Sequence, residues 1–214
     1  MIRIILVVLC LFVLNPVFAV QKGGVKYSET IDYSKLNEKA ISAEAETLFN
    51  KYKNTADENE KRKILNSLLS DYIILGEIDK ENPYYFAQIG FAYGKLEKNR
   101  LAKSNFFRCC SLNGNYPYGH YMFGEYYFDR QQYRKALNEY KKAYNSGYSK
   151  NYDNLYKMGI IYEKFGDYLY ASKYFKQASI YKNSPELQAK IKLMEELLEA
   201  NPLYNLKKRL EQTE

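Results

Sequence analysis

An internal repeat is the feature that most constrains the fold of this chain. Three stretches align when Gly90, Gly124 and Gly159 are superposed, and the steps between these glycines are 34 and 35 residues. A period of this length is typical of one supersecondary unit that buries its apolar face by stacking on its neighbours. The sequence therefore predicts a repeat architecture that begins at Pro83.

Each glycine is followed at fixed distances by residues of the same kind. In the middle repeat these residues are Tyr127, Ala136, Tyr140 and Ala143, which stand 3, 12, 16 and 19 residues after Gly124. At about 100° per residue, the glycine and the tyrosine share one face of a first helix, and the last three share one face of a second. The pattern predicts two helices per repeat, with Gly124 and Ala136 as the contact points and tyrosines packed around them.

This spacing resembles the tetratricopeptide repeat, a helix–turn–helix unit of about 34 residues. The resemblance extends over residues 83–185, and its most similar segment is Lys164–Ala178, with Gly166 and Asp167 at the turn. The chain departs from the family at position 4, where the usual tryptophan is replaced by Phe86, His120 and Leu155. The resemblance implies an all-α fold, a right-handed α-solenoid of antiparallel helix pairs whose first helices line the inner side.

The domain organisation follows from the repeats. Residues 34–82 are expected to form an irregular helix pair, because two segments there are amphipathic. The three repeats occupy residues 83–116, 117–151 and 152–184, and residues 185–214 are expected to form a capping helix and a C-terminal tail. Residues 20–33 carry weak signals and are expected to be mobile.

The N-terminal residues 1–19 have the pattern of a secretory signal peptide. Arg3 precedes an apolar run, Asn15-Pro16 interrupts it, and a short small-residue stretch ends at Ala19. The run is shorter than the about 20 apolar residues of a transmembrane helix. We expect cleavage near Ala19 and export to the periplasm or beyond, with an uncleaved anchor as the alternative.

Charge and reactive side chains exclude several classes of function. The formal net charge is +7, but basic and acidic residues are interleaved as on solvated helix faces, so we expect no nucleic-acid partner. Contact with a membrane is expected only through the signal peptide or uncleaved anchor. His120, the single histidine, and Cys109 stand at packing positions, and Cys109 and Cys110 are adjacent and cannot pair without distortion. We therefore expect neither an enzyme nor a metal or cofactor site.

The resemblance also implies where a partner binds, because family contacts usually come from positions 2, 5, 9 and 12 of the first helices. The predicted partner-binding groove is lined by Tyr84, Phe91, Tyr118, Tyr121, Glu125, Phe128, Tyr156, Ile160 and Glu163. These positions lie about 130° around the helix from the face that packs within a repeat. Exposed aromatic stripes mark interaction sites. The alternative is that neighbouring repeats or flanking helices cover the rings.

These observations predict a protein-interaction module or scaffold that binds a peptide or protein segment in an aromatic groove. The family's clamp for a C-terminal carboxylate is absent, because Ala87, Phe91, Tyr121 and Glu125 stand where its lysines and asparagines are needed. Two alternatives remain open: an envelope protein that binds glycans through the same rings, and a non-catalytic subunit of an envelope enzyme complex. The sequence gives no indication of the oligomeric state.

Overall fold

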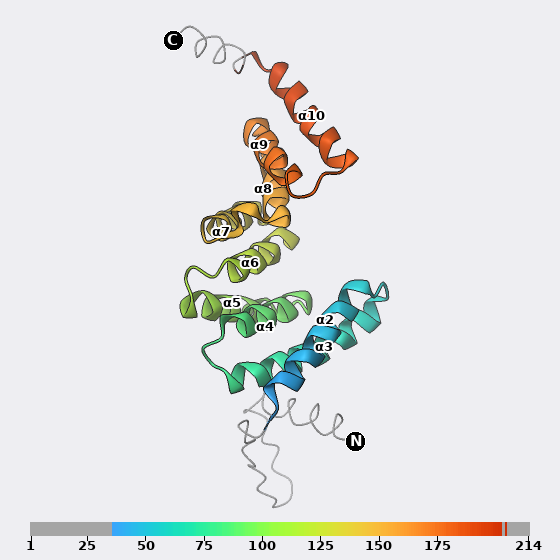
Figure 1. The fold of residues 1–214 in the computed structure, drawn as a ribbon, viewed down its shortest axis with the longest axis vertical. Helices are drawn as coiled ribbons and strands as arrows, with labels where there is room; N and C mark the ends of the chain where they lie inside the picture. The colour runs from blue at the N-terminus through green and yellow to red at the C-terminus, as the bar shows by residue number, and fades with distance from the viewer. Residues whose placement is uncertain (1–35, 203, 205–214) are drawn as a thin grey trace, which may run out of the picture. The chain divides into compact units, whose positions relative to one another are not determined.

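The computed structural model describes residues 36–202 and 204, and its regular elements in this part of the chain are all helical (Figure 1). The helices are α2 (Glu38–Asn54), α3 (Glu58–Ile78), α4 (Pro83–Lys95), α5 (Asn99–Leu112), α6 (Pro117–Asp129), α7 (Tyr133–Asn145), η2 (Tyr148–Lys150), α8 (Tyr152–Lys164), α9 (Tyr168–Ser179) and α10 (Pro185–Glu199). The predicted signal peptide, the predicted mobile segment and most of the C-terminal tail lie outside the described residues.

The helices begin at the residues that capping rules favour. Asn82 and Asn151 accept hydrogen bonds from the first turns of α4 and α8, and Asp167 does the same for α9. Proline occupies the first position of α4, α6 and α10, where its missing N–H has no intrahelical partner to lose. Local sequence therefore determines where each repeat begins.

The helices group into two compact units that meet after Leu112. The N-terminal unit contains the pairs α2/α3 and α4/α5, which correspond to the predicted irregular pair and to the helices of the first repeat. The C-terminal unit contains the pairs α6/α7 and α8/α9, the helices of the second and third repeats, and α10, which packs on α9. Each unit is described by itself below.

The repeat glycines make room for an aromatic ring of the second helix. A Cβ atom built on Gly124 would lie 2.6 Å from the ring of Tyr140, and one on Gly159 would lie 2.5 Å from Phe175. Ala136 is fully buried, but the nearest atoms to Gly124 belong to Tyr140 rather than to Ala136. The close approach between the two helices predicted from the sequence is present, and the ring of Tyr140 is the group that lies nearest to Gly124.

The turn inside each repeat places one residue in the left-handed backbone region. Glu97, Gln131 and Gly166 have φ angles of 60°, 56° and 73°, at equivalent positions of the three repeats. Only Gly166 is the residue that this conformation favours. The turn geometry is therefore kept even where the family's glycine is missing.

No helix of the described residues is long and apolar enough to cross a membrane.

Candidate partner-binding surface

All nine predicted partner-binding residues are half-buried, neither in the core nor fully exposed. Two of them, Tyr84 and Phe91, belong to α4 of the N-terminal unit. The other seven belong to α6 and α8 of the C-terminal unit. The two sets therefore belong to two separate surfaces, one on each unit.

In the N-terminal unit, Phe91 is covered by rings of α2. The centroids of Phe49 and Tyr52 lie 5.5 and 5.6 Å from that of Phe91, both edge-on. Edge-to-face pairs at such distances are favourable packing contacts. At Phe91 a flanking helix covers part of the face that the sequence assigned to a partner, and the ring remains half-buried.

Tyr84 belongs to a small polar network rather than to an open ring face. Its hydroxyl accepts a hydrogen bond of 2.8 Å from Nε2 of Gln88 and lies 3.4 Å from the hydroxyl of Tyr72. Gln88 and Tyr72 are almost completely buried. The hydroxyl of Tyr84 thus satisfies buried polar groups, as such groups require.

In the C-terminal unit, Lys157 of α8 joins two predicted residues of α6. Its Nζ lies 3.3 Å from Oε2 of Glu125 and 4.1 Å from the ring centroid of Phe128. The hydroxyl of Tyr140 donates a hydrogen bond to Oε1 of Glu125. The ring that fills the space beside Gly124 therefore also fixes a carboxylate on the first-helix face.

The same arrangement recurs between α8 and α10. Nζ of Lys190 lies 3.0 and 2.8 Å from the two carboxylate oxygens of Glu163, and 5.5 Å from the ring centroid of Phe175. In both places a lysine contacts an aromatic ring and a glutamate of an earlier first helix, with one second helix between the two in the chain. Bridging lysines thus fix the charged positions of this surface.

The tyrosines of this surface are held by other tyrosines. Tyr121 lies 5.9 Å from both Tyr140 and Tyr148 between ring centroids, and burial, together with the charge of Glu125, raises its pKa. Tyr156 stacks on Tyr152 at 5.7 Å with an interplanar angle of 15°. The remaining two residues are Tyr118, whose ring meets that of Tyr116 at 6.1 Å, and Ile160.

His120 is buried and fully hydrogen-bonded, as expected for a core histidine. Its Nδ1 lies 2.8 Å from Oε2 of Glu139, and its Nε2 lies 2.9 Å from the carbonyl oxygen of Gly114. Both ring nitrogens of His120 are thus engaged by buried partners. Neither nitrogen faces an open site where it could act as a base.

The carboxylate of Glu139 is kept ionised by its neighbours. Burial raises its pKa, but the hydrogen bonds from His120 and Lys142 and their positive charges outweigh burial, so the pKa lies below its ordinary value. Nζ of Lys142 is 2.8 Å from the second carboxylate oxygen. At position 4 of this repeat, where the family has tryptophan, the buried His120 thus contacts the buried Glu139, which in turn contacts the exposed Lys142.

Cys109 is fully buried, and the hydrogen bond with Cys110, together with burial, raises its pKa, which disfavours the reactive thiolate. The described residues contain no group of three or more histidine, cysteine or acidic side chains that is arranged to hold a metal ion.

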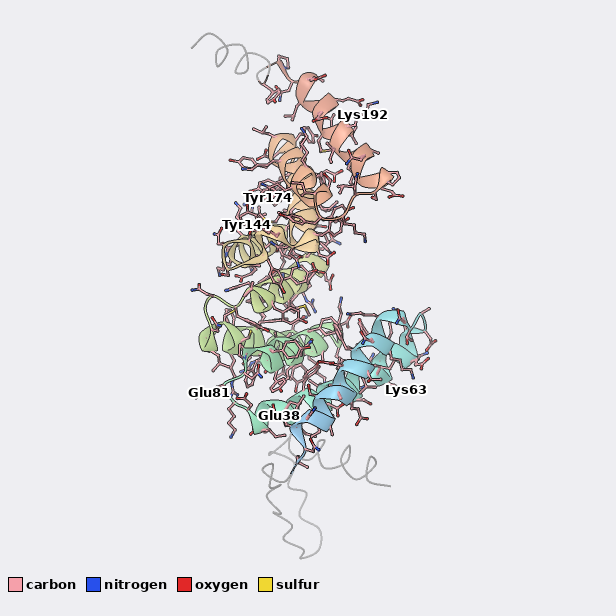
Figure 2. All side chains as sticks on the ribbon, viewed as in Figure 1. Glu38, Lys63, Glu81, Tyr144, Tyr174 and Lys192 are labelled. Atoms are coloured by element: carbon pink, nitrogen blue, oxygen red, sulfur yellow. The ribbon has the colours of Figure 1, made fainter. Side chains whose placement is uncertain are left out.

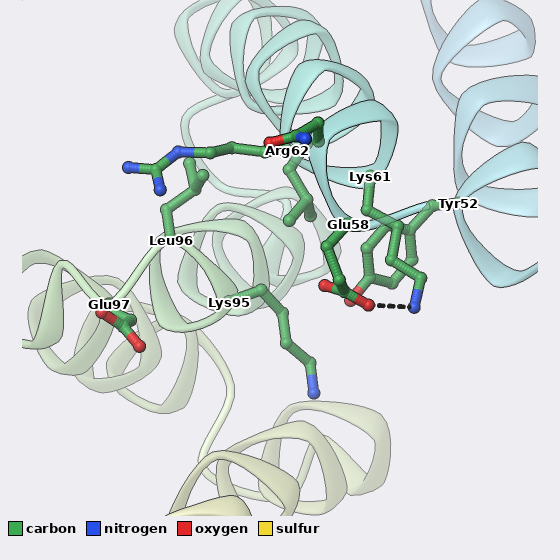
Figure 3. Close-up of a pocket in the computed structure, with 9 residues that line it drawn as sticks. Tyr52, Glu58, Lys61, Arg62, Lys95, Leu96 and Glu97 are labelled. Carbon is green, nitrogen blue, oxygen red and sulfur yellow. Dashed lines mark hydrogen bonds and ion pairs between the residues drawn. The ribbon is translucent and has the colours of Figure 1, made fainter. Parts of the chain in front are cut away.

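A polar pocket in the N-terminal unit was not predicted. It has a volume of about 470 Å³ and lies between the start of α3 and the end of α4, with Tyr52 and Leu65 in its wall. Figure 3 shows the ion pair between Lys61 and Glu58 beside the ring of Tyr52. Its lining comes from separate segments with side chains of both charge signs, so no local motif in the sequence marks it.

Comparison with known proteins identifies the fold. Two crystal structures of MamA, a tetratricopeptide-repeat protein, superpose on the chain with TM-scores of 0.54 and 0.51. They cover 70% and 74% of this chain and 82% and 87% of theirs, at 16% and 23% sequence identity. The chain has the tetratricopeptide-repeat fold. At these identities the likeness concerns the fold alone.

The sequence comparisons are more limited. No family model matches the chain. Protein bimA of Emericella nidulans is 27% identical over 105 residues, which are 49% of this chain and 13% of bimA. This tetratricopeptide-repeat chain thus spans a small part of the length of that relative.

Proposed function

We propose that the chain is a protein-interaction module that binds an extended peptide segment on the first-helix face of its C-terminal unit, formed by α6 and α8. The observation that carries this proposal is the row of half-buried rings on these two helices, namely Tyr118, Tyr121, Phe128 and Tyr156. Tetratricopeptide repeats present their first helices on the inner side, which supports this face as the binding surface.

The face is rigid before any partner arrives. Tyr121 and Glu125 are held by Tyr140, and Lys157 ties α8 to α6. Side chains that are already ordered lose little conformational entropy when they bind. Half-buried aromatic rings on such a surface are suited to act as anchors, while their hydroxyl groups and the neighbouring carboxylates bind polar groups of a peptide.

The contacts favour a peptide over a glycan. Sugars stack on free ring faces, whereas Lys157 lies over the face of Phe128 and Tyr152 stacks on Tyr156. A peptide side chain enters beside a ring or donates to a carboxylate without displacing these partners. The geometry therefore supports the peptide hypothesis, and the accessory-subunit hypothesis has no observation that favours it.

Catalysis is not part of the proposal. The single histidine has both nitrogens engaged, and the buried thiol of Cys109 is held in its protonated form. The tetratricopeptide-repeat fold itself supports binding rather than chemistry, although fold alone does not determine function.

We place the protein outside the cytoplasm. This part of the proposal rests on the charged start, the apolar run and the small-residue exit of residues 1–19. Mass spectrometry of the protein recovered from the cell envelope tests it. A chain that begins near Val20 is expected, and a recovered chain that still begins at Met1 would require the uncleaved anchor instead.

The binding proposal is tested with peptides selected on the intact protein from a displayed library. Tyr118→Ala and Ile160→Ala are expected to weaken the selected peptides about tenfold, a typical effect at an interface hot spot. Leu169→Ala, on the exposed side of α9, is the matched control. Circular dichroism verifies that the helix content is unchanged. Peptide binding that is equally strong in the groove variants, or displacement of the peptides by sugars, would contradict the proposal.

A further inference from the structure

The outer face of α7 and α9 is strongly basic. Its exposed cations are Arg134, Lys135, Lys141 and Lys173. Within the two helices Glu139 is the single acidic residue, and it is buried in contact with His120 and Lys142. The interleaving of charges that holds for the chain as a whole therefore does not hold for this face.

Tyrosine rings connect the two helices beside these lysines. Tyr144 of α7 meets Tyr174 of α9 edge-on at 6.2 Å, and Tyr174 stacks on Tyr162 at 5.5 Å with an interplanar angle of 8°. Tyr170 also stacks with Tyr162, at 5.1 Å between ring centroids. Figure 2 shows Tyr144 and Tyr174 on neighbouring helices at the same side of the unit. The stacked rings make the face stiff, and Tyr170 remains 43% exposed.

Two large aliphatic side chains project from the same face. Leu169 is 46% exposed and Ile180 is 75% exposed. Leu169 stands four residues before Lys173 in α9, and Ile180, the C-cap, stands seven residues after it, which places all three on one stripe. The combination of exposed aliphatic groups and cations on one stripe is typical of helices that lie on membranes.

We propose that this lysine–tyrosine face, formed by the outer sides of α7 and α9, docks on the surface of a bilayer that contains anionic phospholipids. The lysines contact headgroup phosphates, the tyrosines lie at the level of the headgroups, and Ile180 and Leu169 enter the boundary of the acyl chains. The docking is peripheral, in keeping with the finding that no described helix can cross a membrane.

The chemistry of the face favours a lipid surface over an acidic protein. Protein interfaces are enriched in arginine and depleted in lysine, whereas five of the six cationic residues of α7 and α9 are lysines: Lys135, Lys141, Lys142, Lys173 and Lys176. A lysine ammonium is a mobile point charge that adapts to many phosphate positions. The inference is independent of the peptide-binding proposal, because it concerns second helices rather than first helices.

The chain contains no tryptophan, so one introduced tryptophan is a unique fluorescent reporter. Ile180→Trp in the full chain places an indole at the proposed point of entry. Its emission is expected to shift to the blue with vesicles of phosphatidylglycerol and phosphatidylcholine, and to stay unchanged with phosphatidylcholine alone. Phe107→Trp, at a 61% exposed position of α5, is the matched reporter for the N-terminal unit and is expected to stay unchanged.

The contribution of the lysines to the affinity for vesicles is measured in the Ile180→Trp chain, in which Lys135, Lys141 and Lys173 are all replaced by glutamine. At about fivefold per lysine near an anionic surface, the apparent affinity for the vesicles should fall about a hundredfold. The control replaces the exposed Lys39, Lys63 and Lys103 of the N-terminal unit, which changes the net charge by the same amount and should have little effect.

Several outcomes would overturn the inference. One is equal blue shifts with neutral and anionic vesicles, which would show that the lysines do not contribute to docking. Another is an equal loss of affinity in both lysine triples, which would indicate a general effect of net charge. A third is a blue shift of the Ile180→Trp reporter with soluble poly-glutamate as large as that with vesicles, which would assign the face to an acidic polypeptide.

Discussion

The first-helix positions of the two units are covered in different ways. In the N-terminal unit, Phe91 is closed off by the rings of Phe49 and Tyr52, which come from the preceding helix α2. In the C-terminal unit, Phe128 meets Tyr133 of α7 edge-on at 5.6 Å, and Lys157 of the next first helix, α8, lies over its ring and beside Glu125. Both faces thus carry aromatic packing, and the C-terminal unit adds a lysine that links two first helices. The proposed binding face is the one on which charged and aromatic side chains are combined in this way.

A second difference lies at position 4 of the first helix. In the N-terminal unit this position is Phe86, whose ring has the guanidinium of Arg108 at 4.0 Å from its centroid. In the C-terminal unit it is His120, which forms the buried pair with Glu139. The same position in the repeat is thus filled by an apolar ring in one case and by a charged pair in the other. A mutation removes packing contacts at Phe86 and a buried ion pair at His120.

The largest expected effect comes from breaking the buried charge pair. His120→Phe removes one of the two charged partners of Glu139 and leaves Lys142 as the other, so it should lower the free energy of unfolding by about 3 kcal/mol. The double variant His120→Phe with Glu139→Leu converts the site to the apolar type and should recover most of that loss. Urea denaturation measures both. A single variant as stable as the wild type would show that the pair does not contribute to stability.

The pair also predicts a dependence on pH. The pKa of Glu139 is lower in the folded chain than in the unfolded chain, so its contribution to stability is present above the unfolded pKa of about 4.3 and is lost as the pH falls through the folded pKa. Glu139→Gln should therefore remove part of the acid destabilisation. Denaturation curves between about pH 3 and pH 6 compare the two proteins, with Glu58→Gln, an exposed carboxylate of the N-terminal unit, as the control.

The glycines give a graded comparison of the units. A Cβ at Gly124 or Gly159 would lie about half an ångström closer to its ring than the 3.0 Å found at Gly90, and a Cβ at Gly76 would lie at an ordinary 3.4 Å. Replacing glycine with alanine adds about 1 kcal/mol of helix propensity, and overpacking removes about 1–3 kcal/mol.

We therefore expect Gly76→Ala to stabilise the protein and Gly90→Ala to be nearly neutral. Gly124→Ala is expected to destabilise by about 1–2 kcal/mol, and Gly124→Leu by more. Thermal unfolding followed by circular dichroism orders the four variants. If Gly124→Ala melted above Gly76→Ala, the close approach to Tyr140 would not limit the packing.

The covering side chains provide the next test. Phe49→Ala uncovers Phe91 and should lower the stability by about 2 kcal/mol, a value below that of a fully buried phenylalanine because Phe49 is half-buried. Lys157→Met keeps the length of the side chain and removes an ion pair that is partly exposed, so the loss should stay below about 1 kcal/mol. Equal losses of stability in Phe49→Ala and Lys157→Met would contradict the expectation that ring packing stabilises its unit more than the bridging lysine does.

The repeat itself could be predicted because it rests on side-chain size at fixed spacing. Gly90, Gly124 and Gly159 mark three helix pairs in the sequence, and each pair is found where the period places it. The sequence predicts Gly124 and Ala136 as contact points with tyrosines around them, and the atoms nearest to a Cβ on Gly124 are those of the Tyr140 ring. Helical periodicity gives the shared face but not the direction in which this ring projects.

The contacts of the predicted site residues could not be predicted from the sequence, because they come from segments that are distant along the chain. The pattern places Phe91 on the inner face, yet only tertiary packing shows that Phe49 and Tyr52 of another segment occupy it. Likewise, nothing in the local sequence relates Lys157 to Glu125, which stands 32 residues earlier. Contacts between repeats depend on how successive pairs stack, and a single period does not specify this.

The smallest expected effect concerns the turns, where the units can be made alike. Gln131 of the C-terminal unit and Glu97 of the N-terminal unit hold φ angles of 56° and 60°, and Gly166 holds the equivalent angle without a Cβ. The left-handed conformation costs a residue with a side chain about 1–2 kcal/mol. Glycine removes this strain, but it increases the conformational entropy of the unfolded chain, which costs about 0.5–1 kcal/mol.

Gln131→Gly and Glu97→Gly should therefore each stabilise by a few tenths of a kcal/mol up to about 1 kcal/mol, whereas Gly166→Ala should destabilise by a similar amount. Urea midpoints of the three variants test this together, and a loss of stability in both glycine variants would mean that the side chains of Gln131 and Glu97 stabilise their turns by more than the backbone strain.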